Sequence, residues 1–134
     1  MNYQVNCLLE KEKIKVQRNK RKIGIIGEII AEKYLKSKRY KIICKNFYTR
    51  RGEIDIVSKK DNFIVFVEVK LRNNLNYGTP AYAVNYTKIK HMKTAAKIFL
   101  ALNKYNKYAI RFDVIEIINK DGKYLINHIK RVVW

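Results

Sequence analysis

Two carboxylates that interrupt apolar runs are the residues of this sequence best suited to chemistry. Asp55 stands inside IDIV, and Glu68 stands inside FIVFVEVKLR, two positions before Lys70. A carboxylate in apolar surroundings costs free energy unless it is paired with a cation or binds a metal. Oxygen ligands suit Mg²⁺, and a neighbouring lysine can orient a water or stabilise charge on a phosphoryl group. The three residues therefore predict a hydrolytic metal site, with an ordinary acid–lysine salt-bridge cluster as the alternative.

The two strands that carry these residues must also bring them together. Residues two apart on a strand share a face. Alternation divides the strand over 63–72 into one face with Phe66, Glu68, Lys70 and Arg72 and a core face with Val65, Val67, Val69 and Leu71. If the polar turn over 59–62 closes an antiparallel hairpin, the faces that carry Asp55 and Glu68 meet.

Hydrophobic periodicity predicts the other elements around this hairpin. In chain order we expect a helix over 24–38, strands over 40–47, 53–58 and 63–72, a helix over 85–103, and strands over 108–118 and 124–133. This order predicts an α/β fold in which helices flank a mixed sheet, and the strand over 63–72 is apolar enough to lie centrally. Residues 1–22 are expected to form a basic N-terminal arm, followed by one domain over 23–134.

Glu28, near the start of the first predicted helix, is a third acid of interest. The helix dipole alone favours an acid at that position, so a purely structural role is the alternative. Gly24 and Gly27 precede it without forming a dinucleotide-binding motif. They allow either close packing of the helix on the sheet or close approach of a phosphate.

The composition favours a partner that is a polyanion. The chain has 134 residues, and its 30 Lys and Arg against 11 Asp and Glu give a net charge of +19. Such an excess repels itself and predicts a surface for nucleic acid. No apolar run approaches the roughly 18 residues of a membrane helix. Cys7 and Cys44 match no metal or redox spacing, so we expect two free thiols in a cytoplasmic protein.

Three further polar residues are expected to have other roles. Asp113 is interpreted as structural, holding Arg111 at the edge of the sheet. His91 and His128 have no cysteine or acid near them at the spacing of a metal site, so zinc is not expected.

The spacing of Asp55, Glu68 and Lys70 is similar to the PD-(D/E)xK nuclease signature, in which the proline is often absent. A longer ordered string surrounds these residues: Gly27-Glu28, Ala31, Tyr34-Leu35, Asn46, Arg50, GEIDIV over 52–57, VFVEVK over 65–70, Arg72, Tyr77-Gly78, Pro80, Val84, Lys88 and RFDV over 111–114. Together they resemble the YraN-like family of predicted bacterial endonucleases, which is related to archaeal Holliday-junction resolvases. The resemblance covers about residues 23–118.

This resemblance implies a restriction-endonuclease-like αβββαβ core and a metal-dependent nuclease that hydrolyses phosphodiester bonds in branched or single-stranded DNA. It implies that Asp55, Glu68 and Glu28 are catalytic residues that ligate Mg²⁺ or Mn²⁺, with Lys70 as the catalytic lysine. Contacts to the nucleic acid are expected from four cations: Arg72, Lys88, Arg50 and Arg51.

Two questions about partners stay open. Junction-cutting relatives act as dimers, which leaves a homodimer open for this chain. The high positive charge supports a non-catalytic DNA- or RNA-binding module as well as it supports a nuclease, and that module is the alternative function.

Overall fold

The structure, a computed structural model, describes residues 18–72 and 86–132. Its elements are α3 (Arg18–Ser37), β1 (Lys41–Thr49), β2 (Gly52–Lys60), β3 (Phe63–Arg72), α4 (Tyr86–Asn103), β4 (Ala109–Lys120) and β5 (Lys123–Ile129). The predicted order of one helix, three strands, one helix and two strands is confirmed. Most of the predicted basic arm, and the loop that follows β3, lie outside the described residues.

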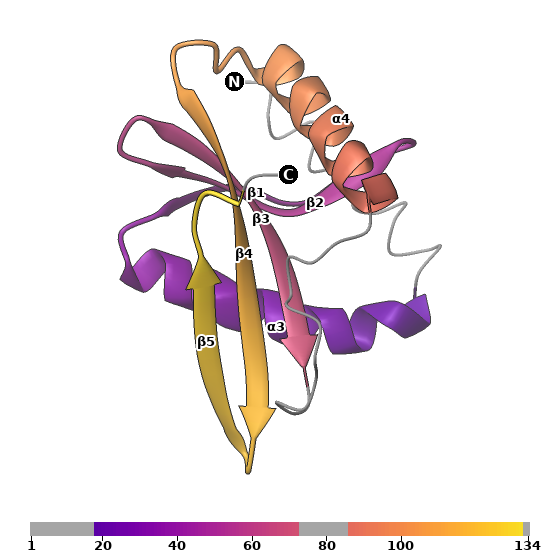
Figure 1. The fold of residues 1–134 in the computed structure, drawn as a ribbon, viewed down its shortest axis with the longest axis vertical. Coiled ribbons are helices and arrows are strands. Elements are labelled where there is room, and N and C mark those ends of the chain that lie inside the picture. The colour runs from indigo at the N-terminus through magenta and orange to yellow at the C-terminus, as the bar shows by residue number, and fades with distance from the viewer. Residues whose placement is uncertain (1–17, 73–85, 133–134) are drawn as a thin grey trace.

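The strands form one mixed sheet in the order β1-β2-β3-β4-β5, with β3 in the centre as predicted (Figure 1). The β2–β3 pair is an antiparallel hairpin, as expected from the turn between them. β3 and β4 are parallel from Phe63↔Ala109 to Arg72↔Ile118. Parallel neighbours need a long crossover connection, and the segment between these two strands contains α4.

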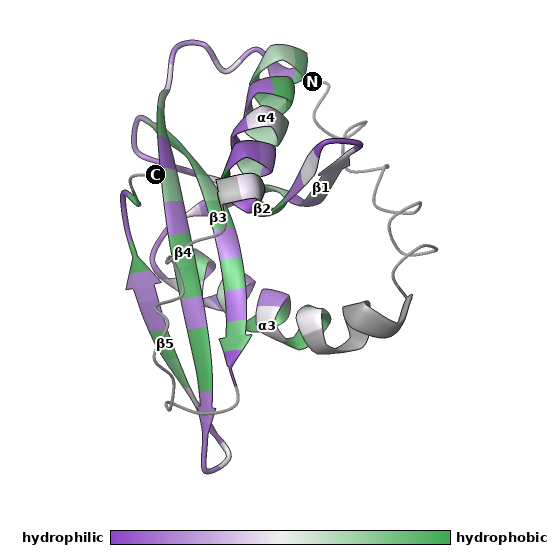
Figure 2. Cartoon of the chain, turned by 45° about the vertical axis from the view of Figure 1, so that its right-hand side comes forward, coloured by the Kyte–Doolittle hydropathy of each residue, from purple (hydrophilic) through white to green (hydrophobic). Residues whose placement is uncertain are grey.

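Both faces of β3 are buried, because each is covered by a helix. Val65 and Val67 pack in one cluster with Ala31 and Leu35 of α3. Ile64 and Phe66 pack in a second cluster with Met92, Ala95 and Phe99 of α4. Burial on two faces explains why β3 is a nearly continuous apolar run, whereas hydrophobic and hydrophilic residues alternate along β4 (Figure 2).

Two element bounds differ from the prediction by more than two residues. α3 begins at Arg18, because the lysines and arginines before Gly24 are good helix formers and a single glycine does not end a helix. β5 ends at Ile129, where its pairing with Val114 ends. Arg131 then adopts a left-handed conformation with φ 57°, which turns the chain out of the strand.

Two further observations concern the predicted environment of the chain. Cys44 is buried and disulfide-bonded, so the prediction of a free thiol there is wrong. The other cysteine, Cys7, lies outside the described residues. None of the helices in the described ranges is both long enough and apolar enough to cross a membrane.

α4 lies so close to the start of β2 that only a glycine fits there. A Cβ added to Gly52 would stand 2.6 Å from the carbonyl carbon of His91 and still closer to its oxygen. Both are backbone atoms of α4 and cannot rotate away. This contact fixes the first turns of α4 against β2, beside the residues described below.

Gly52→Ala is expected to lower the free energy of unfolding by about 1–3 kcal/mol, because β2 and α4 must move apart. Gly24→Ala is the matched control. Its Cβ would meet nothing nearer than the Glu28 side chain at 3.7 Å, and alanine in a helix stabilises by about 0.5–1 kcal/mol relative to glycine. Chemical denaturation of both variants measures the two effects, and effects of the same sign would contradict the close contact.

Candidate active site at the fork of two strands

The candidate site lies where β2 separates from β3 (Figure 1). The last recorded pair of the β2–β3 ladder is Ile56↔Val67, although β3 continues to Arg72 beside β4. Beyond that pair, the N–H of Val69 donates to the side chain of Asp55, at 2.8 Å, instead of to a backbone carbonyl. The Asp55 carboxylate therefore bridges the fork between the strands.

Asp55 and Glu68 lie on the same face at this fork. Extending the β2–β3 register by one residue sets Asp55 opposite Glu68, as the sequence predicted. Burial raises the pKa of Asp55 well above its ordinary value, and the nearby Glu68 carboxylate raises it further. The Val69 N–H lowers the pKa of Asp55 but does not outweigh these effects. Two carboxylates facing each other at a buried position attract a cation.

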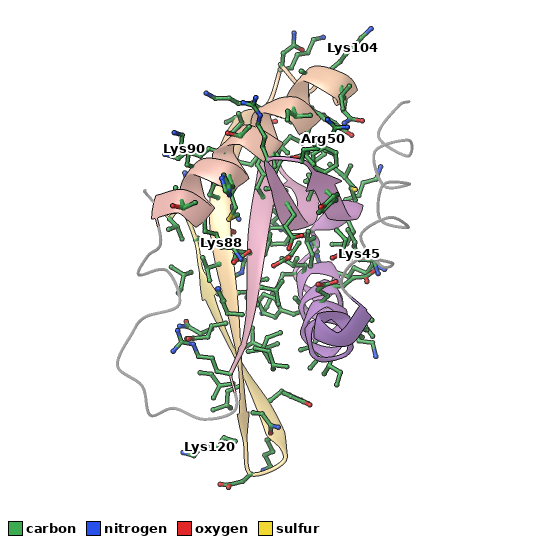
Figure 3. All side chains as sticks on the ribbon, turned by 90° about the vertical axis from the view of Figure 1, so that its right-hand side faces the viewer. Lys45, Arg50, Lys88, Lys90, Lys104 and Lys120 are labelled. Carbon is green, nitrogen blue, oxygen red and sulfur yellow. The ribbon has the colours of Figure 1, made fainter. Side chains whose placement is uncertain are left out.

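Two lysines supply positive charge to Glu68, whose side chain is only 5% exposed. Lys88 Nζ lies 2.6 Å from Glu68 Oε2, and Lys70 Nζ lies 3.4 Å from the same oxygen. Lys88 reaches it from α4, across the layer between helix and sheet (Figure 3). Burial acts to lower the pKa of Lys88, but the carboxylates of Glu68, Asp55 and Glu53 outweigh it and raise that pKa.

Glu28 reaches the site from α3 with the help of Asn46. The Asn46 side-chain amide donates to Glu28 Oε1 at 2.8 Å. Asn46 has φ 55°, and the recorded β1–β2 pairs skip it and Asp55. Asparagine adopts this left-handed conformation more easily than most residues. Glu28 adds to the negative potential that raises the pKa of Asp55, so all three predicted acids influence the same point.

The four cations expected at nucleic acid fall into two groups. Lys88 and Arg72 are in ion pairs with carboxylates, Lys88 with Glu68 and Arg72 Nε with Glu116 Oε2 at 2.8 Å. Arg50 and Arg51 lie exposed in the β1–β2 turn. Lys88 is also exposed, at 45% of its side chain, so the ion pairs and not burial separate the two groups.

A pocket of about 280 Å³ lies between the start of β2 and α4, lined by Gly52, Glu53, Thr87, Lys88, His91 and Met92. Its size is near the lower end for small-ligand pockets. Lys88 is shared between this pocket and the Glu68 ion pair. A group bound in the pocket would therefore lie next to the carboxylate pair.

The donor set at the fork is compatible with a divalent ion held by two carboxylates. Within 18–72 and 86–132, no group of three or more His, Cys, Asp and Glu side chains is arranged to hold a metal. Asp55 and Glu68 remain as neighbouring oxygen donors, and Mg²⁺ commonly binds to one or two carboxylates and several waters. Glu28, the third ligand that the resemblance implies, is instead hydrogen-bonded to Asn46 and acts on Asp55 through its charge.

Sequence reasoning missed a second polar cluster, around Asp113. Arg111 donates to both carboxylate oxygens of Asp113, which confirms the structural role predicted for this pair. His128 was expected to be isolated from acids, and this is wrong: its Nε2 lies 2.7 Å from Asp113 Oδ2. Tyr34 OH bonds to the other ring nitrogen of His128 at 3.1 Å. The pairing of β4 with β5 brings His128 beside Asp113, and the packing of α3 on the sheet adds Tyr34.

Comparison with known proteins shows the family of the chain. A UPF0102 protein of Syntrophomonas wolfei is 47% identical over 109 residues, covering 81% of this chain and 95% of that relative. One of Clostridium novyi is 48% identical over 110 residues, covering 81% and 92%. One of Carboxydothermus hydrogenoformans is 39% identical over 115 residues, covering 86% and 98%. The model of one family matches residues 27–117, and the chain therefore belongs to the uncharacterised protein family UPF0102.

Proposed function

We propose that this protein is a metal-dependent nuclease that hydrolyses phosphodiester bonds in DNA, branched or single-stranded. The observation that carries the proposal is the pair of facing carboxylates, Asp55 and Glu68, at a fork in the sheet with Lys70 and Lys88 against Glu68. The protein as a whole is strongly cationic and attracts a negatively charged substrate. The two carboxylates repel a phosphate group unless a metal cation binds between them and that phosphate.

The order of elements supports a restriction-endonuclease-like core. α3, β1, β2, β3, α4 and β4 follow one another as αβββαβ, and β5 adds a strand at the edge. The residues of the PD-(D/E)xK signature, Asp55, Glu68 and Lys70, lie on the second and third strands of this core. Fold and signature thus support the same proposal independently.

The proposed division of roles follows from the position of each side chain. Asp55 and Glu68 are the ligands of Mg²⁺ or Mn²⁺, and Glu28 strengthens the negative potential at Asp55. Such an ion supplies Lewis acidity and lowers the pKa of a water. Lys70, 40% exposed and close to Glu68, is placed to orient that water and to stabilise charge on the phosphate.

Lys88 is proposed to exchange partners when substrate binds. In the structure its ammonium lies against Glu68. A divalent cation bound to Glu68 would repel this ammonium, and Lys88 would then be placed to contact a phosphate oxygen, the role that the sequence resemblance implies.

The second candidate function is a nucleic-acid-binding module without catalysis. It is favoured by a specific observation: Lys88 and Lys70 both form ion pairs with Glu68, so two ammonium groups compensate the charge of this carboxylate. In such a module the acidic cluster is an ion-pair network that holds α4 on the sheet. Metal binding separates the two functions, because only the nuclease requires it.

Asp55→Ala and Lys70→Ala are both expected to abolish cutting of DNA in the presence of Mn²⁺ while leaving binding to DNA largely intact. Supercoiled plasmid, a four-way junction and a single strand are the substrates, and nicked or shortened products are the readout. Asp61→Asn is the matched control, since Asp61 is exposed in the β2–β3 turn and asparagine tolerates its φ of 53°.

Cutting that persists in both site variants would assign the activity to a contaminant or to another site. Two results together would favour the nucleic-acid-binding module without catalysis. The wild-type protein would bind DNA without cutting it, and calorimetry would detect no binding of divalent ions that depends on Asp55.

A further inference from the structure

The outward face of α4 is cationic along its length. Lys90, Lys93 and Lys97 are exposed, and their spacing of three and four residues places them on one side of the helix. Lys104, also exposed, follows directly after the helix. The helix itself, YTKIKHMKTAAKIFLALN, contains no Asp or Glu.

The other helix presents a different surface. On α3, Glu32 binds Lys36 and Lys45 of β1, both at 2.8 Å. Exposed isoleucines occupy a further part of α3: Ile25, Ile26 and Ile29. Positive charge on this side is thus partly neutralised and is interrupted by apolar groups. The two sides of the sheet differ in their suitability for a polyanion.

The β1–β2 turn extends the cationic face of α4. Arg50 and Arg51 are exposed and directly precede Gly52, whose backbone abuts His91 of α4. In Figure 3, Arg50 and Lys90 both lie toward the α4 end of the molecule, whereas Lys120 lies at the opposite end, in the β4–β5 hairpin. Lys88, two residues before Lys90, points to the opposite side of α4 and lies against Glu68. The first turn of α4 therefore places this end of the cationic face close to the candidate active site.

The length of this face fits a short stretch of nucleic acid. From Lys90 to Lys104 the helical rise is about 21 Å, at roughly 1.5 Å per residue. Since phosphates of one DNA strand are spaced by about 3.4 Å along the duplex axis, the face spans about six nucleotides. Contacts of this kind are to phosphate, so they hold the ligand without reading its sequence.

We propose that the nucleic-acid backbone runs along the outward face of α4, held by Lys90, Lys93 and Lys97 and by the β1–β2 turn, and leads to the carboxylates at the fork. This inference rests on the proposed function for its choice of nucleic acid as ligand. It adds the side of the sheet on which the ligand lies.

The test compares two triple variants with equal loss of charge. The first is Lys90→Ala, Lys93→Ala and Lys97→Ala, which keeps a good helix former at each position. The second, the control, is Lys120→Ala, Lys123→Ala and Lys130→Ala, at exposed positions of the β4–β5 region. Binding of a fluorescein-labelled 20-base-pair duplex is measured in EDTA over a series of salt concentrations, with folding of both variants checked by circular dichroism.

The α4 variant is expected to lose affinity, and the slope of log K against log salt is expected to fall by about 0.9 for each contacting lysine, about 2.7 in all. The control variant should keep most of the wild-type slope. Equal losses in the two variants, or no change in the α4 variant, would overturn the proposal. So would a loss confined to binding of phosphatidylserine vesicles, which would assign the face to a membrane.

The same experiment separates this inference from the nuclease proposal. EDTA removes divalent ions, so the binding measured does not depend on cutting. A wild-type protein that binds through α4 but never cuts DNA with Mn²⁺ would refute the nuclease and leave the docking face intact. If the wild type cuts DNA and the α4 variant cuts it equally well, with the same salt dependence, only the docking face is refuted.

Discussion

Asp113→Ala is expected to lower the free energy of unfolding by about 3–5 kcal/mol, the cost of leaving a buried charge without its partner. Arg111, 8% exposed, donates to Asp113 from Nε at 2.9 Å and from a terminal nitrogen at 2.8 Å. The Asp113 carboxylate also accepts the backbone N–H of Arg131 and contacts His128. Removing the carboxylate takes away the contacts that hold His128 of β5 and the backbone of Arg131. It also leaves the buried guanidinium of Arg111 without its carboxylate partner.

Glu32→Ala is the control for this effect. Glu32 also binds two cations, but Lys36 and Lys45 are 60% and 41% exposed. Exposed ion pairs contribute little, so a loss of about 1 kcal/mol or less is expected. Urea denaturation of both variants provides the comparison. If Asp113→Ala costs no more than Glu32→Ala, the Asp113 cluster does not hold β5 in place.

The same cluster is expected to make the fold sensitive to acid. Burial acts to raise the pKa of Asp113, but hydrogen bonds from His128, Arg111 and the Arg131 backbone outweigh it, and the pKa is lowered. The stabilisation is then present above the unfolded-state pKa of about 3.9 and is lost as the pH falls through the lower folded-state value. Urea midpoints measured from about pH 4 down to about pH 2 should fall in the wild type, and Asp113→Asn should flatten that dependence.

The sequence predicted the strands well because each carries a local signal. The apolar run of β3 predicted burial, and the alternation around Glu68 correctly separated the two faces of that strand. The turn over 59–62 predicted the hairpin that sets Asp55 opposite Glu68. These features depend on neighbours in sequence, and period-two alternation is enough to derive them.

The surroundings of the carboxylates depend on contacts between distant segments. The alternation of β2 runs unbroken through Asp55, so nothing in it reveals that the strand leaves β3 there. The left-handed Asn46, which turns toward Glu28, gives only a weak signal as an asparagine within a strand. Lys88 is twenty positions from Glu68, and only the packing of α4 determines that it contacts that residue.

Asp55→Asn is expected to make the metal-free protein more stable. The raised pKa of Asp55 means that folding disfavours its ionised form, so this carboxylate costs stability as the pH rises above the ordinary value of about 3.9. Asparagine removes the charge and the repulsion with Glu68 and keeps an oxygen for the Val69 N–H. In EDTA at pH 7 we expect a gain of about 0.5–2 kcal/mol in the free energy of unfolding, typical of relieving a functional site.

Mn²⁺ is expected to reverse this order of stability. A ligand at one hundred times its dissociation constant stabilises the folded state by about 2.7 kcal/mol, and Asp55→Asn lacks one of the two facing carboxylates. Thermal unfolding is measured in EDTA and in Mn²⁺ for the wild type, Asp55→Asn and the exposed control Asp61→Asn. Asp55→Asn should melt at a higher temperature than the wild type in EDTA and at a lower one in Mn²⁺, and the control should follow the wild type in both. A variant destabilised in EDTA would contradict the repulsion between Asp55 and Glu68. A variant stabilised by Mn²⁺ as strongly as the wild type would contradict the metal site, because the ion would then bind without the carboxylate that the fork holds in place.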